Sequence, residues 1–181
     1  GFLCPGHVAV ITGSHVFQPL VDDHGAPCVV VGFEPLQIME GVVHLVRQLV
    51  RGEPALENLY PQAVREEGNP TARALMEQVF VPASSAWRAL GELPGSGLEL
   101  GPAFRDLDAL HRYGLTLGPD RDPPGCRCGE VITGRCLPAE CPLFGGVCTP
   151  VYPVGPCMVS SEGSCQAHFR YHRRPTGPRV R

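Results

Sequence analysis

The stretch PCVVVGFEPLQIMEGVVHLVRQLVRG, residues 27–52, decides the fold of the first part of this sequence. Its first seven residues, 27–33, are apolar on both faces of an extended chain, which is typical of a strand in a parallel sheet covered by helices. Pro35 then suits the first position of a helix, and the apolar residues within 39–50 keep helical spacing up to Gly52. The stretch therefore predicts a buried strand followed by an amphipathic helix.

Shorter signals on both sides extend this alternation of strand and helix. Residues Val8–Thr12 are rich in β-branched side chains and predict a strand. An Asn-Pro pair predicts the cap and first turn of a helix over 71–79, and a short strand is expected over Trp87–Leu90. A further helix is expected to begin at Pro102, with Phe104, Leu107, Leu110 and Tyr113 on one face. The pattern favours an α/β class, with a partial parallel-sheet domain and flanking helices over residues 1–117.

Composition limits the classes of function. The 181 residues carry 15 basic and 18 acidic side chains, a formal net charge of −3, and every basic residue is Arg. This near-neutral balance argues against a nucleic-acid binder, which normally presents a basic field. No apolar run approaches the ~20 residues needed to cross a bilayer. Because no secretory signal pattern is visible either, we expect a cytoplasmic protein without membrane contact.

The second part of the sequence has a different character. Residues 118–125 contain no apolar side chain apart from proline rings and predict a domain boundary. The following region, 118–172, is rich in Cys, Gly and Pro with little periodicity, and we expect a small loop-rich cysteine domain there. Residues 173–181 are Arg-rich without an acid, which predicts a disordered, solvated tail.

Seven of the nine cysteines fall in this second part, at positions 126, 128, 136, 141, 148, 157 and 165. A disulfide scaffold is disfavoured because the total is odd and no secretory signal accompanies it. Structural zinc is also disfavoured, since zinc sites usually need two paired knuckles of suitable spacing. The Cys126-x-Cys128 pair is too narrow for such a knuckle, and the step from Cys141 to Cys148 is too wide.

An iron–sulfur cluster agrees best with this spacing. A 4Fe–4S cubane accepts four thiolates that arrive from separate turns, so a loop-rich sequence suits it. Seven cysteines exceed four ligands, and one sulfur of a C-x-C pair is then available for thiol–disulfide chemistry. Arg127 lies between two cysteines, where it either favours their anionic forms or points to solvent. Both interpretations of Arg127 stay open at this point.

Several motifs in fixed order resemble one known family. In the cysteine-rich part they are GCRCGE (125–130), ECPLFG (140–145), VCTP (147–150) and GPCMVSSEG (155–163). Upstream they are GFLCPGHV (1–8), VGFEPL (31–36), EGNP (67–70), Trp87-Arg88 and Leu90-Gly91. These blocks are very similar to the carboxy-terminal part of the HypD family, the hydrogenase expression/formation proteins. The resemblance covers nearly the whole chain except the Arg-rich tail.

The resemblance implies a factor for nickel–iron hydrogenase maturation rather than a classical enzyme. Proteins of this family have two α/β domains and a small 4Fe–4S domain. They work with HypC and HypE to assemble the Fe(CN)2CO group of the hydrogenase, which they hold transiently. The resemblance implies four cluster ligands, Cys126, Cys141, Cys148 and Cys165. It implies a neighbouring redox pair, Cys128 and Cys157, and leaves Cys136 without a required role.

The resemblance also bears on the first part of the chain. Cys4, His7 and Glu34 are candidates for a cleft that contacts the iron unit or a partner, although Cys4 alone would also suit a core position. The family's amino-terminal domain, with its Cys-Pro-x-Cys motif, is expected to lie outside this sequence, which opens on Gly1. Two alternative functions remain, a cluster-dependent disulfide reductase and a structural zinc module.

Three further features have plainer interpretations. Cys28, within an apolar run, is expected to be a small core residue. His168 and His172 share one helical face and are expected at the surface. The residues Ser160–Glu162 resemble a helix cap.

Overall fold

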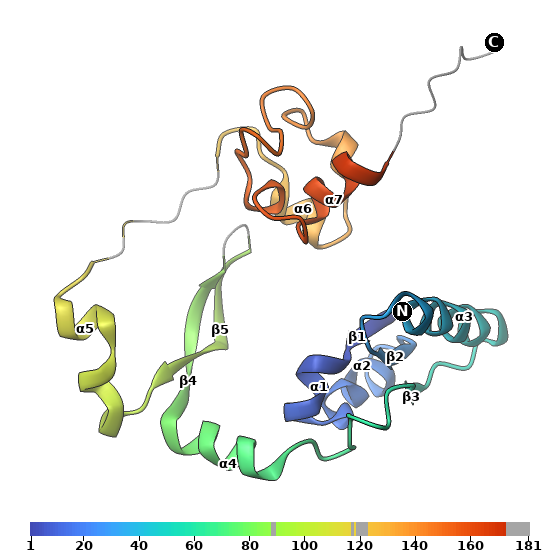
Figure 1. The fold of residues 1–181 in the computed structure, drawn as a ribbon, viewed down its shortest axis with the longest axis horizontal. Helices are drawn as coiled ribbons and strands as arrows, with labels where there is room; N and C mark the ends of the chain where they lie inside the picture. The colour runs from blue at the N-terminus through green and yellow to red at the C-terminus, as the bar shows by residue number, and fades with distance from the viewer. Residues whose placement is uncertain (88–89, 117, 119–122, 173–181) are drawn as a thin grey trace. The chain divides into compact units, whose positions relative to one another are not determined.

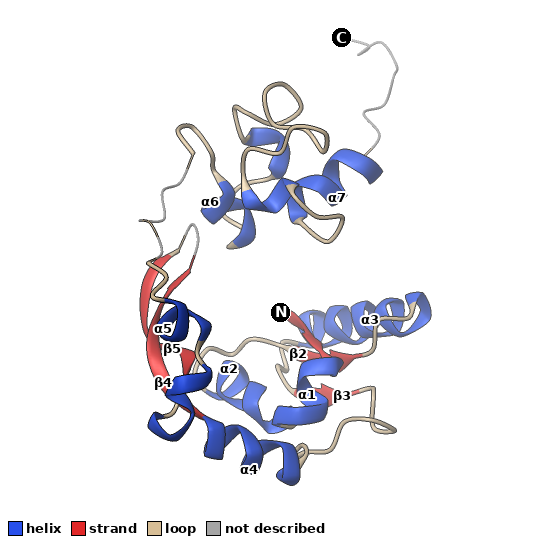
Figure 2. Cartoon of the chain, turned by 60° about the vertical axis from the view of Figure 1, so that its left-hand side comes forward, coloured by secondary structure: helices blue, strands red, loops and turns tan. Residues whose placement is uncertain are grey.

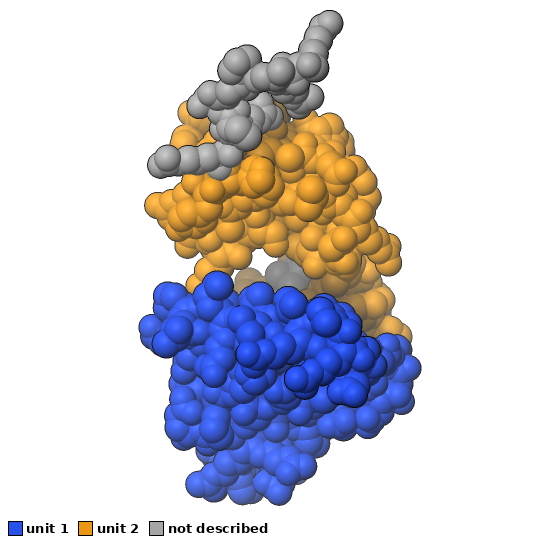
Figure 3. Space-filling view, turned by 90° about the vertical axis from the view of Figure 1, so that its right-hand side faces the viewer, with its two compact units in different colours: residues 1–80 blue, residues 81–181 orange. Residues whose placement is uncertain are grey.

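The computed structural model describes residues 1–87, 90–116, 118 and 123–172. The chain divides into two compact units, Gly1–Phe80 and Val81–Arg181, which Figure 3 colours separately. The predicted tail at 173–181 lies outside the described residues, as does part of the predicted boundary at 118–125. The predicted division between residues 117 and 118 therefore stays a prediction.

A three-stranded parallel sheet forms the centre of the first unit (Figure 1). Its order is β1 (Phe2–Pro5), β2 (Cys28–Val31) and β3 (Leu56–Asn58), so β2 lies in the middle. All four residues of β2 are buried. The predicted buried strand and the parallel sheet are both confirmed.

The two faces of this sheet pack against different elements. Successive side chains of a strand point to opposite faces. Cys28 belongs with Cys4 to a buried cluster that also includes residues of α1 (Gly6–Thr12) and α2 (Gln18–Asp22). On the other face, a Cβ placed on Gly41 would lie 2.6 Å from Val31 and 2.8 Å from Leu3. The helix that carries Gly41 therefore packs directly on the sheet.

That helix is α3 (Pro35–Arg51), and its ends form as the sequence predicts. Glu34 caps its first turn in a capping box with Gln37, and Gly52 ends it in the left-handed conformation at φ 69°. The predicted Asn cap is also confirmed, because the Asn69 side chain accepts a hydrogen bond of 3.0 Å from the backbone N–H of Ala72. It begins α4 (Pro70–Val79).

The strand predicted over Val8–Thr12 is wrong, because these residues lie in α1 and the strand is the preceding β1. Preference for the strand state depends on packing more than on residue type. Here the chain turns at Gly6, where a Cβ would lie 2.5 Å from the carbonyl oxygen of Val31. The turn buries Ala9 completely against the sheet, and a short 3₁₀ helix, η1 (Ser14–Phe17), follows.

The second unit contains a two-stranded sheet of β4 (Phe80–Trp87) and β5 (Gly91–Leu100). Residues 88 and 89 of the strand predicted over Trp87–Leu90 lie outside the described residues, while Trp87 ends β4 and Leu90 lies in a turn. The helix predicted from Pro102 is interrupted. A 3₁₀ helix, η2 (Pro102–Leu107), precedes α5 (Ala109–Tyr113), since Asp108 has an extended backbone and its side chain caps α5.

The cysteine-rich part consists of short helices joined by loops, as Figure 2 shows. They are α6 (Cys128–Ile132), η3 (Pro138–Glu140), η4 (Pro156–Met158) and α7 (Ser164–Tyr171). The cap predicted at Ser160–Glu162 is wrong, because Gly163 caps α7 and no side chain contributes a bond there. Within the described residues, no helix has the length and apolar character that a membrane span requires.

Candidate metal centre

Cysteine side chains make up most of the core of the cysteine-rich part. Four of them are buried together with Val131 and Met158, and Met158 is completely enclosed. The four are Cys128, Cys148, Cys157 and Cys165. Cys126 and Cys136 pack against this cluster while half-buried, and Cys141 is buried as well. A core of thiols instead of Leu and Ile indicates that these residues have a chemical role beyond packing.

Each thiol arrives from a different short element. Cys128 is the first residue of α6, Cys157 is the middle residue of η4, and Cys165 is the second residue of α7. Cys141 directly follows η3. Cys148 is held in a tight loop, in which its backbone N–H donates to the carbonyl of Leu143 at 2.8 Å. This arrangement agrees with the expectation that separate turns deliver the thiols.

Two of the predicted cluster ligands, Cys141 and Cys148, lie within electrostatic reach of the other two, Cys126 and Cys165. Burial raises the pKa of the Cys126 thiol, and nearby Cys141 and Cys148 raise it further. Burial likewise raises the pKa of Cys165, on which Cys141 and Cys148 again act in the same direction. Like charges in a buried site oppose ionisation, so these thiols become thiolates together only when a cation compensates them.

The predicted redox pair also lies in contact. Cys157 forms side-chain hydrogen bonds with Cys128 and with Cys165, and its Sγ atom lies 3.1 Å from that of Cys165. Burial and the bond with Cys165 raise the pKa of Cys157 to about 12, against a lowering by Cys128. Cys157 therefore contacts both a predicted ligand and its predicted redox partner.

Backbone groups are directed at two of the sulfur atoms. The N–H of Val154 donates to Sγ of Cys148 at 3.3 Å, and the backbone N–H of Cys128 bonds to the thiol of Cys126, which lowers its pKa. Hydrogen bonds to ligand sulfurs are one of the factors that set the potential of an iron–sulfur cluster. Such donors do not follow from sequence spacing, and we had not predicted them.

Gly155 lies where no larger residue fits. A Cβ at this position would lie 2.6 Å from Sγ of Cys126 and 3.8 Å from Sγ of Cys157. The backbone at Gly155 therefore closes one side of the thiol cluster. The sequence signal for this close approach was the Gly-Pro pair before Cys157, which the sequence analysis interprets only as part of a family motif.

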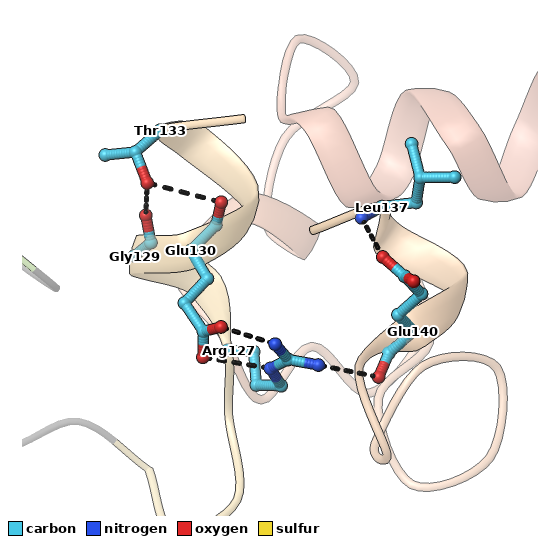
Figure 4. A network of polar contacts seen from close by, with 6 residues as sticks. All are labelled: Arg127, Gly129, Glu130, Thr133, Leu137 and Glu140. Carbon is cyan, nitrogen blue, oxygen red and sulfur yellow. Dashed lines mark hydrogen bonds and ion pairs between the residues drawn. The ribbon is translucent and has the colours of Figure 1, made fainter. Parts of the chain in front are cut away.

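The partly exposed Arg127 side chain bonds to Glu130 and to Glu140, which lie on two different short helices (Figure 4). Its guanidinium forms a two-pronged ion pair with Glu130, one bond of which measures 2.9 Å. It also donates to the carbonyl oxygen of Glu140 at 3.4 Å, immediately before Cys141. Through these bonds Arg127 joins two cysteine-bearing segments. Its charge also lowers the pKa of Cys136, against the effect of burial, and so favours the thiolate of Cys136. The sequence signal for this ion pair was the i, i+3 spacing of Arg127 and Glu130.

As they stand, no three His, Cys, Asp or Glu side chains of the described residues are arranged to hold a metal ion. The residues nevertheless fit an iron–sulfur cluster in chemistry. The donor set is all thiol, and three of the four predicted ligands lie in or against one buried cluster. The fourth, Cys141, acts electrostatically on Cys126 and Cys165, and backbone N–H groups point at the sulfurs of Cys126 and Cys148. No described pair reproduces the two-knuckle pattern of structural zinc.

The predicted cleft residues of the first unit are only partly brought together. Cys4 is 2% exposed, and burial together with the neighbouring Cys28 raises its pKa to about 12. His7, on the first turn of α1, is exposed and packs against Phe33, with ring centroids 4.5 Å apart and the rings tilted by 43°. Phe33 adjoins Glu34, so His7 and Glu34 share the carboxyl edge of the sheet while Cys4 points into the core. Cys28 is a fully buried core residue, as its apolar surroundings suggest.

A pocket of about 480 Å³ lies beside α7. It is lined by Phe144, Phe169 and two stacked imidazoles, those of His168 and His172, whose centroids are 4.3 Å apart. The predicted common face of the two histidines is confirmed. Burial and the neighbouring His172 lower the pKa of His168.

Comparison with known proteins gives a consistent result. A family model described as HypD, hydrogenase formation hypA family, matches residues 1–172. The chain is 41% identical over 174 residues to the hydrogenase maturation factor HypD of Cupriavidus necator, covering 96% of this chain and 46% of that protein. The corresponding factor of Escherichia coli is also 41% identical over 174 residues, with 96% and 47% covered. A hydrogenase expression/formation protein, HupD, of Azotobacter chroococcum is 42% identical over 175 residues, with 96% and 46% covered.

The chain thus spans about half the length of the curated relatives it matches. The matched half is the carboxy-terminal portion of those proteins.

Proposed function

Because the chain belongs to the HypD family of hydrogenase formation proteins, we propose that its cysteine-rich part is the redox-active 4Fe–4S module of a nickel–iron hydrogenase maturation factor. The convergence of six thiols in one small core, with the buried Cys141 acting electrostatically on two of them, carries this proposal. Cys126, Cys141, Cys148 and Cys165 would hold the cluster. A bound 4Fe–4S cluster supplies one-electron storage close to the remaining thiols.

The chain's own redox step uses Cys128 and Cys157. Oxidation of these two thiols to a disulfide forms one S–S bond and releases two electrons and two protons, and reduction takes them back. Their hydrogen bond supports the pairing, since the two sulfur-bearing side chains already meet. The contact of Cys157 with Cys165 gives the pair a route for electrons to a predicted ligand.

The substrate is an iron ion that acquires two cyanide groups and one carbon monoxide. Assembly of this Fe(CN)2CO unit requires electrons and thiolate ligands shielded from water. We propose that the factor works on it together with HypC and HypE. His7 and Glu34, at the carboxyl edge of the parallel sheet, are candidates for contact with the iron unit or with a partner.

Anaerobic purification with iron and sulfide analysis tests the cluster. We expect about four iron and four sulfide per chain, and loss of most of the iron in Cys141→Ser and Cys148→Ser. Cys136→Ser is the matched control, since Cys136 packs against the same core without being a predicted ligand. A colourless protein with one zinc would instead identify a structural zinc module. Iron retention in both ligand variants would refute the ligand assignment.

Thiol trapping tests the redox pair, and partner binding separates the remaining alternatives. Alkylation before and after reduction is expected to show Cys128 and Cys157 changing state together. If neither changes, the pair has no redox role. Binding of HypC by the iron-loaded chain supports an assembly factor, whereas turnover of small disulfides without such binding supports a disulfide reductase.

A further inference from the structure

Helix α3 is packed with its polar side toward the sheet. Its residues that face the sheet are Gly41, His44 and Gln48, and Gln48 is only 5% exposed. Most apolar residues of the same helix are exposed, while Leu45 is half-buried. An amphipathic helix of a complete domain normally does the reverse and directs its apolar stripe to the core.

Specific hydrogen bonds hold α3 in this orientation. The Glu57 carboxylate of β3 accepts a bond of 2.5 Å from Gln48 Nε2 and lies 2.6 Å from His44 Nδ1. Gln48 Oε1 accepts a further bond of 2.9 Å from the backbone N–H of Ala55. Rotation of the helix toward an ordinary orientation would break all three contacts and leave a buried amide without partners. The exposed apolar side is therefore a built feature of this unit.

We define the α3 stripe as the exposed apolar residues of the outer side of this helix, Leu36, Met39, Val42, Val43, Val46, Leu49 and Val50. The two ends are the most open, with Leu36 80% and Val50 81% exposed. The residues follow one another at three- and four-residue steps and form a continuous row along the helix. A contiguous apolar patch of this kind marks an interaction site.

We propose that the α3 stripe is the surface on which the amino-terminal half of a family-length HypD chain packs. The relatives are about twice as long as this chain, and the portion of them that it matches is carboxy-terminal. In this chain Gly1 lies against α3, since a Cβ placed on Gly1 would lie 3.2 Å from Leu45 Cδ2. In a family-length protein the preceding residues thus enter beside α3, where tethering strongly favours packing on the neighbouring stripe.

This proposal concerns the first unit and is independent of the thiol chemistry proposed above. The chain can lack the expected iron and sulfide while the α3 stripe is covered, and it can contain them while the stripe stays exposed. The two proposals therefore have separate readouts in the same preparation.

Carbene footprinting read by mass spectrometry tests the stripe, with native methionines as probes. The whole chain is labelled alone and after fusion behind the amino-terminal half of the Cupriavidus necator relative. Met39, on the stripe, is expected to lose at least about fivefold of its label in the fusion, since packing excludes the reagent together with water. Met76 of α4 and the enclosed Met158 serve as internal references and keep their labelling within about twofold, as a local contact predicts.

Two substitutions make the test specific. In the fusion, Val46→Asp places a charge within the stripe and is expected to restore the labelling of Met39, because an unpaired charge is costly to bury. Glu40→Lys, on the flank of the same helix, is expected to leave the protection intact. Equal labelling of Met39 in the chain alone and in the fusion would overturn the proposal.

Measurements on the chain alone keep the proposal open to refutation even if the fusion does not fold. Since Val46 is half exposed, Val46→Asp is expected to leave the melting temperature of the chain within about 2 °C. A large drop would show that the stripe belongs to the unit's own core. A dimer of the chain that Val46→Asp dissociates would assign the stripe to a second copy instead.

Discussion

The Sγ atoms of Cys157 and Cys165 lie 3.1 Å apart within the buried thiol cluster. Cys157 also bonds through its side chain to Cys128. One thiol thus contacts a proposed cluster ligand and a proposed disulfide partner together. All three side chains belong to one buried cluster.

Alkylation of the metal-free, reduced protein is expected to show how strongly this contact protects Cys157. Burial and the bond with Cys165 raise the pKa of Cys157 to about 12, so its thiolate is scarce near pH 8. Because the thiolate is the reactive form, we expect iodoacetamide to label Cys157 at least about 100-fold more slowly than free cysteine. The rate should rise steadily as the pH approaches 12.

Cys165→Ala removes one cause of this shift and should accelerate the labelling of Cys157. Peptide mass spectrometry follows the site directly. A rate equal to that of free cysteine in the unsubstituted protein would contradict the prediction.

Gly155→Ala is expected to disrupt the thiol cluster. The added Cβ would lie 2.6 Å from Sγ of Cys126, and overpacking of a core typically costs about 1–3 kcal/mol. We therefore expect a lower melting temperature and a reduced iron content after anaerobic reconstitution. Gly146→Ala is the matched control, because a Cβ at Gly146 has no neighbour within 4 Å. Equal effects of the two substitutions would show that Gly155 is not needed for close approach.

Local signals predicted those elements of the fold in which one residue type has a single strong preference. The four-residue strand β2, the start of α3 at Pro35 and the cap at Asn69 all follow from such signals. The strand prediction for Val8–Thr12 was wrong because β-branched residues suit a strand only when a neighbouring strand is available. The strand that pairs with this side of β2 is Phe2–Pro5, and local composition does not reveal that pairing.

The site was predictable in its donor atoms and not in its surroundings. Spacing and motifs identified the cysteine-rich part, and six of its seven thiols lie in or against one core. The ion pair of Arg127 with Glu130, the N–H of Val154 and the close approach of Gly155 depend on how loops fold back on one another. The outward direction of the α3 stripe was also hidden, because helical periodicity identifies an apolar side without saying what covers it.

The pair of core thiols in the first unit predicts a loss of stability at alkaline pH. Burial, together with the neighbouring Cys28, raises the pKa of Cys4 to about 12 from an unfolded value of 9.0. Between these values the unfolded chain loses the Cys4 proton while the folded chain keeps it. The free energy of unfolding therefore falls as pH rises from about 9 to 12, by at most about 1.4 kcal/mol per pH unit for this group. Below pH 9 both states keep the proton, and Cys4 contributes no slope.

Urea unfolding of the reduced, metal-free chain at pH 8, 9.5 and 11 measures this slope. Cys4→Ala should make the alkaline decrease shallower, since it removes the group that titrates. Val30→Ala opens a cavity in the same buried cluster and keeps the thiol, so it should lower stability at every pH and leave the slope unchanged. If Cys4→Ala and the unsubstituted chain lose stability in parallel, the raised pKa of Cys4 is not the cause.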